Sequence, residues 1–226
     1  NALTNEFEKR NIAKPVISVV TQVRVDKEDP SFKKPSKPIG PFYTKEEADA
    51  EAAKDGSTYV EDAGRGYRKV VPSPMPKEIV EKEAVRALLE ADVLTICSGG
   101  GGIPVVAEDG QYVGVEAVND KDFSARVLAE NVDADRLIIL TGVDNIYINY
   151  NQPDQKALEQ ISVAEAEEYI KEGHFAAGSM LPKIEAALDF VKGDDKRKAI
   201  ITSIENLENI DKEAGTEIGR AHVWTP

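Results

Sequence analysis

The stretch that decides the predicted fold is Val93-Leu-Thr-Ile-Cys-Ser98-Gly-Gly-Gly-Gly-Ile-Pro-Val105. It begins as a short apolar run of the kind that forms a buried β-strand, and it continues into four consecutive glycines. Because glycine has no Cβ atom, the backbone N–H groups of such a run can converge on an anion. We therefore expect a strand that ends beside a phosphate or carboxylate ligand.

The glycines differ from the two commonest phosphate-binding loops. A Walker A loop ends in Gly-Lys-Ser/Thr, where this chain has Ile103 and Pro104. A dinucleotide-binding fingerprint needs a third glycine at the position of Pro104. The glycines alone leave open a flexible connection that binds nothing, so the neighbouring residues must decide.

Composition narrows the class of protein. The chain has 226 residues, of which 41% are hydrophobic, and this is enough for a sizeable core. No apolar run approaches the ~20 residues that span a membrane. A formal net charge of −13 argues against a nucleic-acid surface, which needs a basic face. The single cysteine, Cys97, excludes an internal disulfide. We expect a cytoplasmic protein that binds neither membranes nor nucleic acids.

Apolar β-type runs alternate with helical patterns along most of the chain. Strands are predicted at residues 15–25, 93–97, 114–118, 136–141 and 199–203, and helices at residues 44–54, 78–91, 120–132, 162–173 and 182–191. This alternation, with strands apolar on both faces, is typical of a parallel α/β sheet covered by helices on both sides. Ligands bind beyond the carboxyl ends of such strands, where the loops at residues 99–104, at 141–144 and from 203 onward are expected to converge.

Residues 26–76 differ in composition from the rest of the chain, because they are rich in Pro, Gly, Lys and Asp. The segment is too long for a plain linker and predicts a small subdomain or lid. Thr44 and Glu47 are spaced as a capping box at the start of its helix. Ser162 and Glu165 form a second capping box further along the chain.

Three lysines are candidates for an anion site. Lys121 lies between Asp120, the expected N-cap of a helix, and Asp122, and Lys183 lies near the start of another helix. A lysine at a helix N-terminus opposes the helix dipole, so a bound anion would explain these positions. Ion pairing or simple solvation of the lysines is the alternative. Lys37 lies in the stiff segment Lys37-Pro-Ile-Gly-Pro-Phe42, which is an unusual place for a surface charge.

Other chemistries find less support in the sequence. His174 is the only histidine before residue 219, so the sequence offers neither a histidine-based triad nor a zinc cluster, and we predict no protein-held metal. Tyr147, Tyr150 and Met180 lie close to predicted strand ends. They are either packing residues or part of a slot for an adenine ring.

Several stretches together resemble the carbamate kinases of the amino acid kinase superfamily. The similar segments are residues 37–42 (KPIGPF), 61–74 (EDAGRGYRKVVPSP), 98–105 (SGGGGIPV), 114–122 (GVEAVNDKD), 140–144 (LTGVD) and 173–186 (GHFAAGSMLPKIEA). The glycine run and the Asp-Lys-Asp triplet alone would suit several amino acid kinases. The segment around Lys37 favours carbamate kinase.

The resemblance implies a fold as well as a domain organisation. The fold is a three-layer α/β/α sandwich with a mainly parallel sheet, incomplete at the N-terminus, plus a small protruding subdomain. Residues 1–25 would be the remainder of an N-terminal substrate-side lobe, and residues 26–76 the protruding subdomain. Residues 77–218 would form the lobe with the glycine loop and the nucleotide site. Residues 219–226 differ in sequence character from the residues before them and resemble a translated sequencing adapter. They are predicted to be non-native.

The resemblance also implies an activity, which is reversible phosphoryl transfer between carbamoyl phosphate and ADP to give ATP and carbamate, with Mg²⁺. It further implies a place in arginine metabolism and a homodimer for the full-length protein. The implied catalytic residues are Lys37, Lys121 and Lys183, which would neutralise the transferring phosphoryl group or reach the substrate, and Asp122, which would orient the lysines. Substrate-side backbone amides would come from Gly99, Gly100, Gly101 and Gly102, and the nucleotide pocket from Thr141, Asp144, Tyr150 and Met180.

One departure from the family pattern affects the expected activity. Family members begin with a strand and a Gly-Gly-Asn loop, followed by a His-Gly-Asn-Gly-Pro segment, and neither is present here. We therefore expect the parent protein to be the kinase and this chain by itself to be inactive. The alternatives are another amino acid kinase, such as one acting on acetylglutamate or UMP, and a nucleotide-binding module without turnover.

Overall fold

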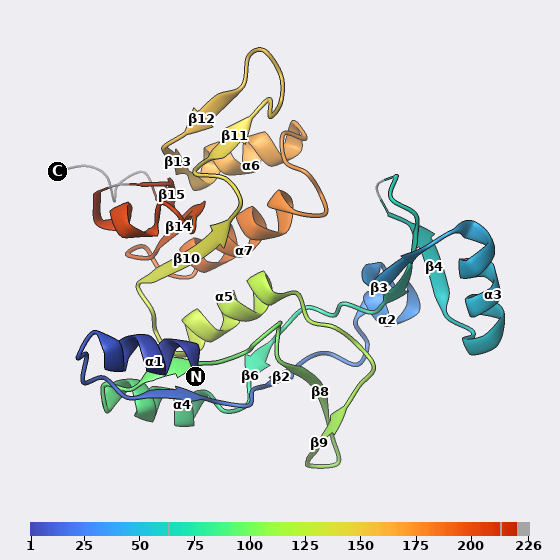
Figure 1. Ribbon diagram of the computed structural model, residues 1–226, viewed down its shortest axis with the longest axis horizontal. Coiled ribbons are helices and arrows are strands. Elements are labelled where there is room, and N and C mark those ends of the chain that lie inside the picture. The colour runs from blue at the N-terminus through green and yellow to red at the C-terminus, as the bar shows by residue number, and fades with distance from the viewer. Residues whose placement is uncertain (63, 213, 221–226) are drawn as a thin grey trace. The chain divides into compact units, whose positions relative to one another are not determined.

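The computed structural model describes residues 1–62, 64–212 and 214–220 (Figure 1). The chain divides into two compact units, Asn1–Ser124 and Ala125–Pro226, and the division falls within helix α5 (Lys121–Asn131). Both units combine helices with parallel strand pairs, so the predicted α/β class is confirmed. The predicted boundaries near residues 25, 76 and 218 stay predictions. Among the described helices, none has the length and apolar character needed to cross a membrane.

Two sheets form the body of the first unit. In spatial order their strands are β1 (Val16–Ser18) and β7 (Leu94–Ile96) in one, and β6 (Glu78–Ile79), β2 (Gln22–Arg24), β8 (Ile103–Glu108) and β9 (Gln111–Gly114) in the other. The pairs β1–β7 and β2–β8 are parallel, whereas β6 and β9 pair antiparallel at the two edges of the larger sheet. The buried side chains of this part are mostly valine and isoleucine: Val23, Val25, Ile79, Val85, Val105 and Val106. Helices α1 (Ala2–Lys9) and α4 (Lys82–Glu90) also belong to this body of the first unit.

The predicted single strand over residues 15–25 is wrong, because the structure breaks it into β1 and β2, which belong to different sheets. The break lies between Ser18 and Gln22, where the Thr21 side chain makes two hydrogen bonds. The Oγ1 of Thr21 donates to the carbonyl of Val19 (2.9 Å) and accepts from the amide of Ser98 (2.8 Å). This buried hydroxyl therefore joins the break to the residue that precedes the glycines.

Two further elements of the first unit differ from the prediction. The helix predicted from residue 78 begins only at Lys82, because residues 78–79 pair with β2 as strand β6. The strand predicted at residues 114–118 is wrong, since β9 ends at Gly114 and closes a hairpin with β8. Asp109 and Gly110 form its two-residue turn, both with positive φ (48° and 78°). An Asp-Gly pair is a common hairpin turn, so this signal was present in the sequence.

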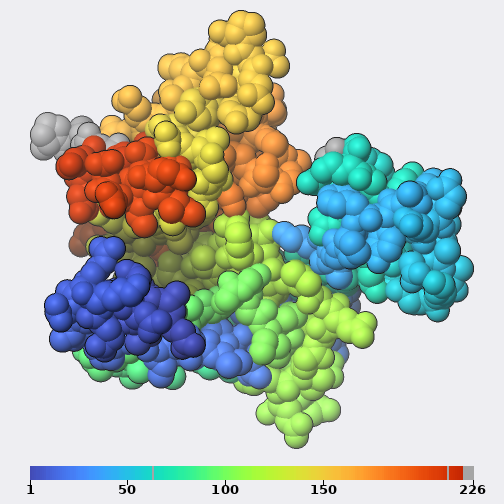
Figure 2. Space-filling model, in the orientation of Figure 1, coloured from blue at the N-terminus to red at the C-terminus, as the bar shows by residue number. Residues whose placement is uncertain are grey.

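Residues 26–76 form an antiparallel sheet with its own helices. Its strands, in spatial order, are β3 (Lys37–Tyr43), β5 (Tyr67–Val71) and β4 (Thr58–Glu61), and its helices are α2 (Pro30–Lys33) and α3 (Lys45–Asp55). Helix α3 begins at the predicted capping box of Thr44 and Glu47, which is confirmed, and it ends at Gly56 in the left-handed conformation (φ 71°). Helix α3 packs against all three strands, and Figure 2 shows this segment (blue to cyan) gathered into one body.

The second unit is built on one four-stranded sheet. In spatial order its strands are β10 (Arg136–Thr141), β14 (Lys198–Ser203), β15 (Thr216–Gly219) and β13 (Gln160–Ser162). Helices α6 (Val163–Lys171) and α7 (Met180–Lys192), the hairpin of β11 (Ile146–Ile148) and β12 (Lys156–Leu158), and the 3₁₀ helix Leu207–Lys212 complete the unit. Helix α7 contacts β10, β14 and β15 and supplies much of the core, with Ile184, Leu188, Phe190 and Val191 buried.

Part of the segment predicted to be non-native is integrated into this sheet. Gly219 is the last residue of β15, in which Ile218 is fully buried. The Arg220 guanidinium forms an ion pair with Asp195 (2.7 Å) and donates to the carbonyl of Lys192 (2.9 Å). Residues 221–226 lie outside the described residues, and the non-native origin of residues 219–226 stays a prediction.

The second predicted capping box is confirmed at the start of α6, and it gives a test of stability. The Ser162 hydroxyl accepts from the Glu165 amide (3.2 Å), and the Glu165 carboxylate accepts from the Ser162 amide (2.7 Å). We expect Ser162→Ala to lower the free energy of unfolding by about 1 kcal/mol in urea titrations. Ser179→Ala is the matched control, because Ser179 precedes α7 without a side-chain cap. Equal losses for both variants would contradict the prediction.

The same box predicts a pH dependence. The hydroxyl and the amide of Ser162 lower the pKa of Glu165 below its usual value. A carboxyl group with a lowered pKa in the folded state stabilises the protein above its unfolded pKa, and this stabilisation is lost as the pH falls through the folded pKa. The difference in stability between the parent protein and Ser162→Ala should therefore shrink on acidification below about pH 4.5.

Candidate active site

The four glycines after β7 form two pairs with different surroundings. Gly101 has a φ of 130°, and a Cβ atom there would lie 2.4 Å from the carbonyl oxygen of Asn119. Gly102 has a φ of 76°, and its Cβ would lie 2.5 Å from a methyl carbon of Val23. Gly99 and Gly100 are exposed, with open space where a Cβ would stand. The second pair of glycines is thus fixed by packing, and the first pair faces solvent.

One of the four predicted amide donors has a partner within the loop. The amide of Gly101 donates to the carbonyl of Ser98 (2.6 Å) and is used inside the loop. Gly99 and Gly100 are exposed, and the substrate-side role of all four glycines stays a prediction. Ser98 itself has a positive φ of 58°, which places the turn directly at the end of the apolar run.

The loop is fastened to the start of helix α5. The Gly101 carbonyl accepts from the side-chain amide of Asn119 (3.2 Å) and from the hydroxyl of Ser124 (2.8 Å). Both donors are buried. Helix α5 also begins with the Lys121–Asp122 pair, so these bonds fix the glycine loop relative to two of the predicted catalytic residues.

Lys37 lies at this same place, although it is 83 residues away in the sequence from its partner. Its Nζ is 2.5 Å from Oδ2 of Asp120. Oδ1 of Asp120 accepts from the amide of Asp122 (2.9 Å), which confirms Asp120 as the cap of α5. Burial raises the pKa of Asp120, but the hydrogen bonds from Lys37 and from the Asp122 amide, with the charges of Lys37 and Lys121, outweigh it. The pKa therefore lies below the usual value for an aspartate.

Lys121 and Asp122 form the second ion pair of the cluster. The Nζ of Lys121 lies 3.0 Å and 3.1 Å from the two carboxylate oxygens of Asp122. The carboxylate is buried, whereas the lysine is mostly exposed. Lys37, Lys121 and Asp122 thus gather at one helix start of the first unit. Lys183 lies in the first turn of α7 in the second unit, and its association with the other three stays a prediction.

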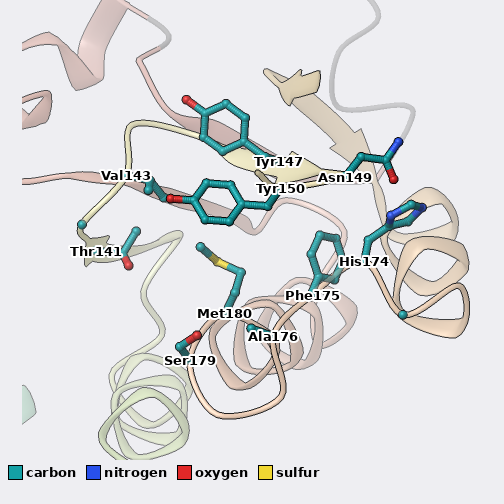
Figure 3. Close-up of a pocket in the computed structure, with 12 residues that line it drawn as sticks. Thr141, Val143, Tyr147, Asn149, Tyr150, His174, Phe175, Ala176, Ser179 and Met180 are labelled. Atoms are coloured by element: carbon teal, nitrogen blue, oxygen red, sulfur yellow. The ribbon is translucent and has the colours of Figure 1, made fainter. Parts of the chain in front are cut away.

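The second unit contains a pocket of about 560 Å³, a size typical of small-molecule sites. Thr141, Tyr150 and Met180, which were predicted for the nucleotide, line it. Figure 3 shows the Tyr150 ring and the Met180 side chain pointing into the pocket. The rings of Tyr147 and Tyr150 are 5.8 Å apart and give this side a broad aromatic wall.

Asp144, the fourth predicted nucleotide residue, lines a neighbouring hollow instead. Its Oδ1 accepts from the hydroxyl of Ser203 (2.6 Å). Thr141 and Ser203 are register partners at the carboxyl ends of β10 and β14, so two of the three predicted loops are neighbours. The glycine loop belongs to the first unit, and its convergence with these two stays a prediction.

Several residues that line the larger pocket were not predicted from the sequence: Asn149, His174, Phe175, Ala176 and Ser179. Four of these lie in the segment 173–186 that carries the family resemblance, from which only Met180 and Lys183 were assigned roles. The resemblance of this segment to the family could therefore have indicated these residues. Among the described residues, no group of three or more His, Cys, Asp or Glu side chains could hold a metal ion.

Comparisons with known proteins agree with one another. The model of the amino acid kinase family matches residues 43–203. Carbamate kinase 2 of Enterococcus faecalis is 98% identical over 220 residues, which cover 97% of this chain and 70% of that protein. The chain belongs to the carbamate kinase family. The carbamate kinase of Clostridium perfringens is 53% identical over 219 residues, covering 96% of this chain and 70% of that protein.

Solved structures support the same family. Carbamate kinase from Giardia lamblia bound to AMP-PNP has a TM-score of 0.87 and 44% sequence identity, over 97% of this chain and 70% of that chain. An N-acetylglutamate synthase from Neisseria gonorrhoeae has a TM-score of 0.54 and 18% identity, over 92% of this chain and 38% of that one, which shows the fold alone. No comparison favours another amino acid kinase over carbamate kinase.

Proposed function

We propose that the protein catalyses reversible phosphoryl transfer between carbamoyl phosphate and ADP, giving ATP and carbamate. The bond between phosphorus and the carbamate oxygen breaks, and a bond forms from phosphorus to a β-phosphate oxygen of ADP. The observation that carries the proposal is the 98% identity to a carbamate kinase of Enterococcus faecalis. The cluster of Lys37, Lys121 and Asp122 is consistent with it, because phosphoryl transfer requires positioning and positive charge rather than a protein nucleophile.

The proposed roles are those that the resemblance to carbamate kinases implies. Lys121 and Lys183 neutralise charge on the transferring phosphoryl group, and Asp122 orients the lysines. Lys37 reaches the substrate from the sheet of residues 26–76. The amides of Gly99, Gly100 and Gly102 are the proposed substrate-side donors, since the amide of Gly101 donates to Ser98 within its own loop.

ADP is proposed to occupy the pocket of the second unit, with Tyr150 and Met180 against the adenine and with Thr141 and Asp144 nearby. A related structure of this family is bound to AMP-PNP, which supports a nucleotide site of this kind. Mg²⁺ is proposed to arrive with the nucleotide, whose phosphates it would neutralise. Mg²⁺ commonly keeps several waters and takes one or two carboxylates besides phosphate oxygens, which fits a site with few acidic side chains.

The experiment has two parts. ATP formation from carbamoyl phosphate, ADP and Mg²⁺ is measured in a luciferase assay. For comparison, ATP consumption is measured with acetylglutamate and with UMP. ADP binding is measured separately by calorimetry. Substrate-dependent ATP formation by the complete protein is the expected result. ADP binding without ATP formation would favour the non-catalytic nucleotide-binding module instead.

We also infer from the family resemblance that the complete protein is a cytoplasmic homodimer of arginine metabolism. Size-exclusion chromatography with light scattering tests the dimer. A monomer at all concentrations would contradict this part of the proposal.

A further inference from the structure

Asp120 is a part of the cluster to which neither the sequence nor the proposed mechanism gave a role beyond capping. Its two carboxylate oxygens bind different partners: Oδ2 lies 2.5 Å from the Lys37 ammonium, and Oδ1 accepts from the amide of Asp122 (2.9 Å). One side chain thus connects strand β3 with the first turn of α5. The carboxylate is also well shielded, with 16% of its side chain exposed.

A carboxylate at this place has an electrostatic cost. Carbamoyl phosphate is an anion, and a negative side chain beside its proposed site repels it. Capping does not require the charge, because asparagine caps helices about as well as aspartate does. The charge is needed for the contact with Lys37, whose ammonium would otherwise sample many rotamers at the end of a long side chain.

We infer that Asp120 is a positioning residue, which holds the Lys37 ammonium at the start of α5, next to Lys121 and Asp122. The inference rests on the proposed role of Lys37 in the reaction, although the contact itself can be tested without turnover. A second contact supports it, since the amide of Val118 donates to the carbonyl of Pro72 (3.0 Å). Residues 118 and 120 therefore both bind the segment that carries Lys37.

The first experiment measures the contact directly. The folded protein is briefly acetylated with an isotopically labelled, amine-reactive acetylating reagent. Mass spectrometry of the labelled protein then gives the extent of acetylation at each lysine. Asp120→Asn keeps an acceptor for the Asp122 amide but removes the charge, so Lys37 should become about fivefold more reactive. Asp62→Asn is the matched control, because the Asp62 side chain is 17% exposed and pairs with Arg68 (3.2 Å) in the same segment. Unchanged reactivity of Lys37 in Asp120→Asn would overturn the inference.

The second experiment is a double-mutant cycle on ATP formation by the complete protein. Asp120→Asn should lower kcat/KM for carbamoyl phosphate by about 10- to 100-fold, with little change in the KM for ADP. In a Lys37→Met background the same change should have less than about a twofold effect, because the group that it positions is gone. Full additivity of the two substitutions would show that Asp120 acts through another group, and would overturn the inference.

The two experiments also separate this inference from the proposed function. If the unsubstituted protein forms no ATP, the proposed function fails, while the acetylation result still decides whether Asp120 holds Lys37. If Asp120→Asn loses activity together with its melting temperature, and the Asp62→Asn control does not, the effect is structural and the inference is wrong.

Discussion

A Lys183→Ala variant of the complete protein is expected to form ATP from carbamoyl phosphate and ADP about 10²- to 10³-fold more slowly than the unsubstituted complete protein. The reason is that a transition state with charge spread over three phosphoryl oxygens loses one fixed cation. The melting temperature should change little, because Lys183 lies in the first turn of α7 and outside the set of buried α7 residues that form the core.

The control is Lys192→Ala at the other end of the same helix. Lys192 forms an ion pair with Glu167 (2.7 Å), and both side chains are largely exposed. Removing it changes the helix charge by the same amount but should leave the rate unchanged. If both variants kept the full rate, the proposed role of Lys183 would be wrong.

A Gly101→Ala variant is expected to be the most destabilising single change in the glycine loop. The added methyl group would lie 2.4 Å from the Asn119 carbonyl, at a φ of 130° that alanine rarely adopts. Backbone strain and overpacking together should lower the free energy of unfolding by about 2–5 kcal/mol. Urea titration of the purified variant measures this loss.

Gly100→Ala provides the comparison one residue earlier. Its Cβ would meet open space, so the free energy of unfolding should change by less than about 1 kcal/mol. If Gly100→Ala were as unstable as Gly101→Ala, the division of the loop into a packed pair and an open pair would be wrong.

Features that depend on neighbouring residues could be predicted from the sequence. The capping boxes at Thr44 and Ser162 and the cap at Asp120 all form, because each is closed by residues at most three positions away. Strand β10 was predicted with its observed bounds, since a short continuous apolar run is typical of a buried strand.

Features that depend on distant partners could not be predicted in this way. At the break between β1 and β2, the Thr21 hydroxyl accepts a hydrogen bond from Ser98, 77 residues away, which no local pattern indicates. The contact between Lys37 and Asp120 is equally remote. The sequence therefore supplied candidate residues for the site, whereas the pairing of Lys37 with Asp120 came only from the structure.

The double hydrogen bond at the Gly101 carbonyl has a consequence for chimaeric enzymes. Because Asn119 and Ser124 close on that carbonyl, residues 98–102 and 119–124 form a single building block despite their separation in the sequence. A loop transplanted from a relative with a different substrate would arrive without its matching donors. Grafting both segments together should preserve expression and folding, whereas moving the glycines alone should not.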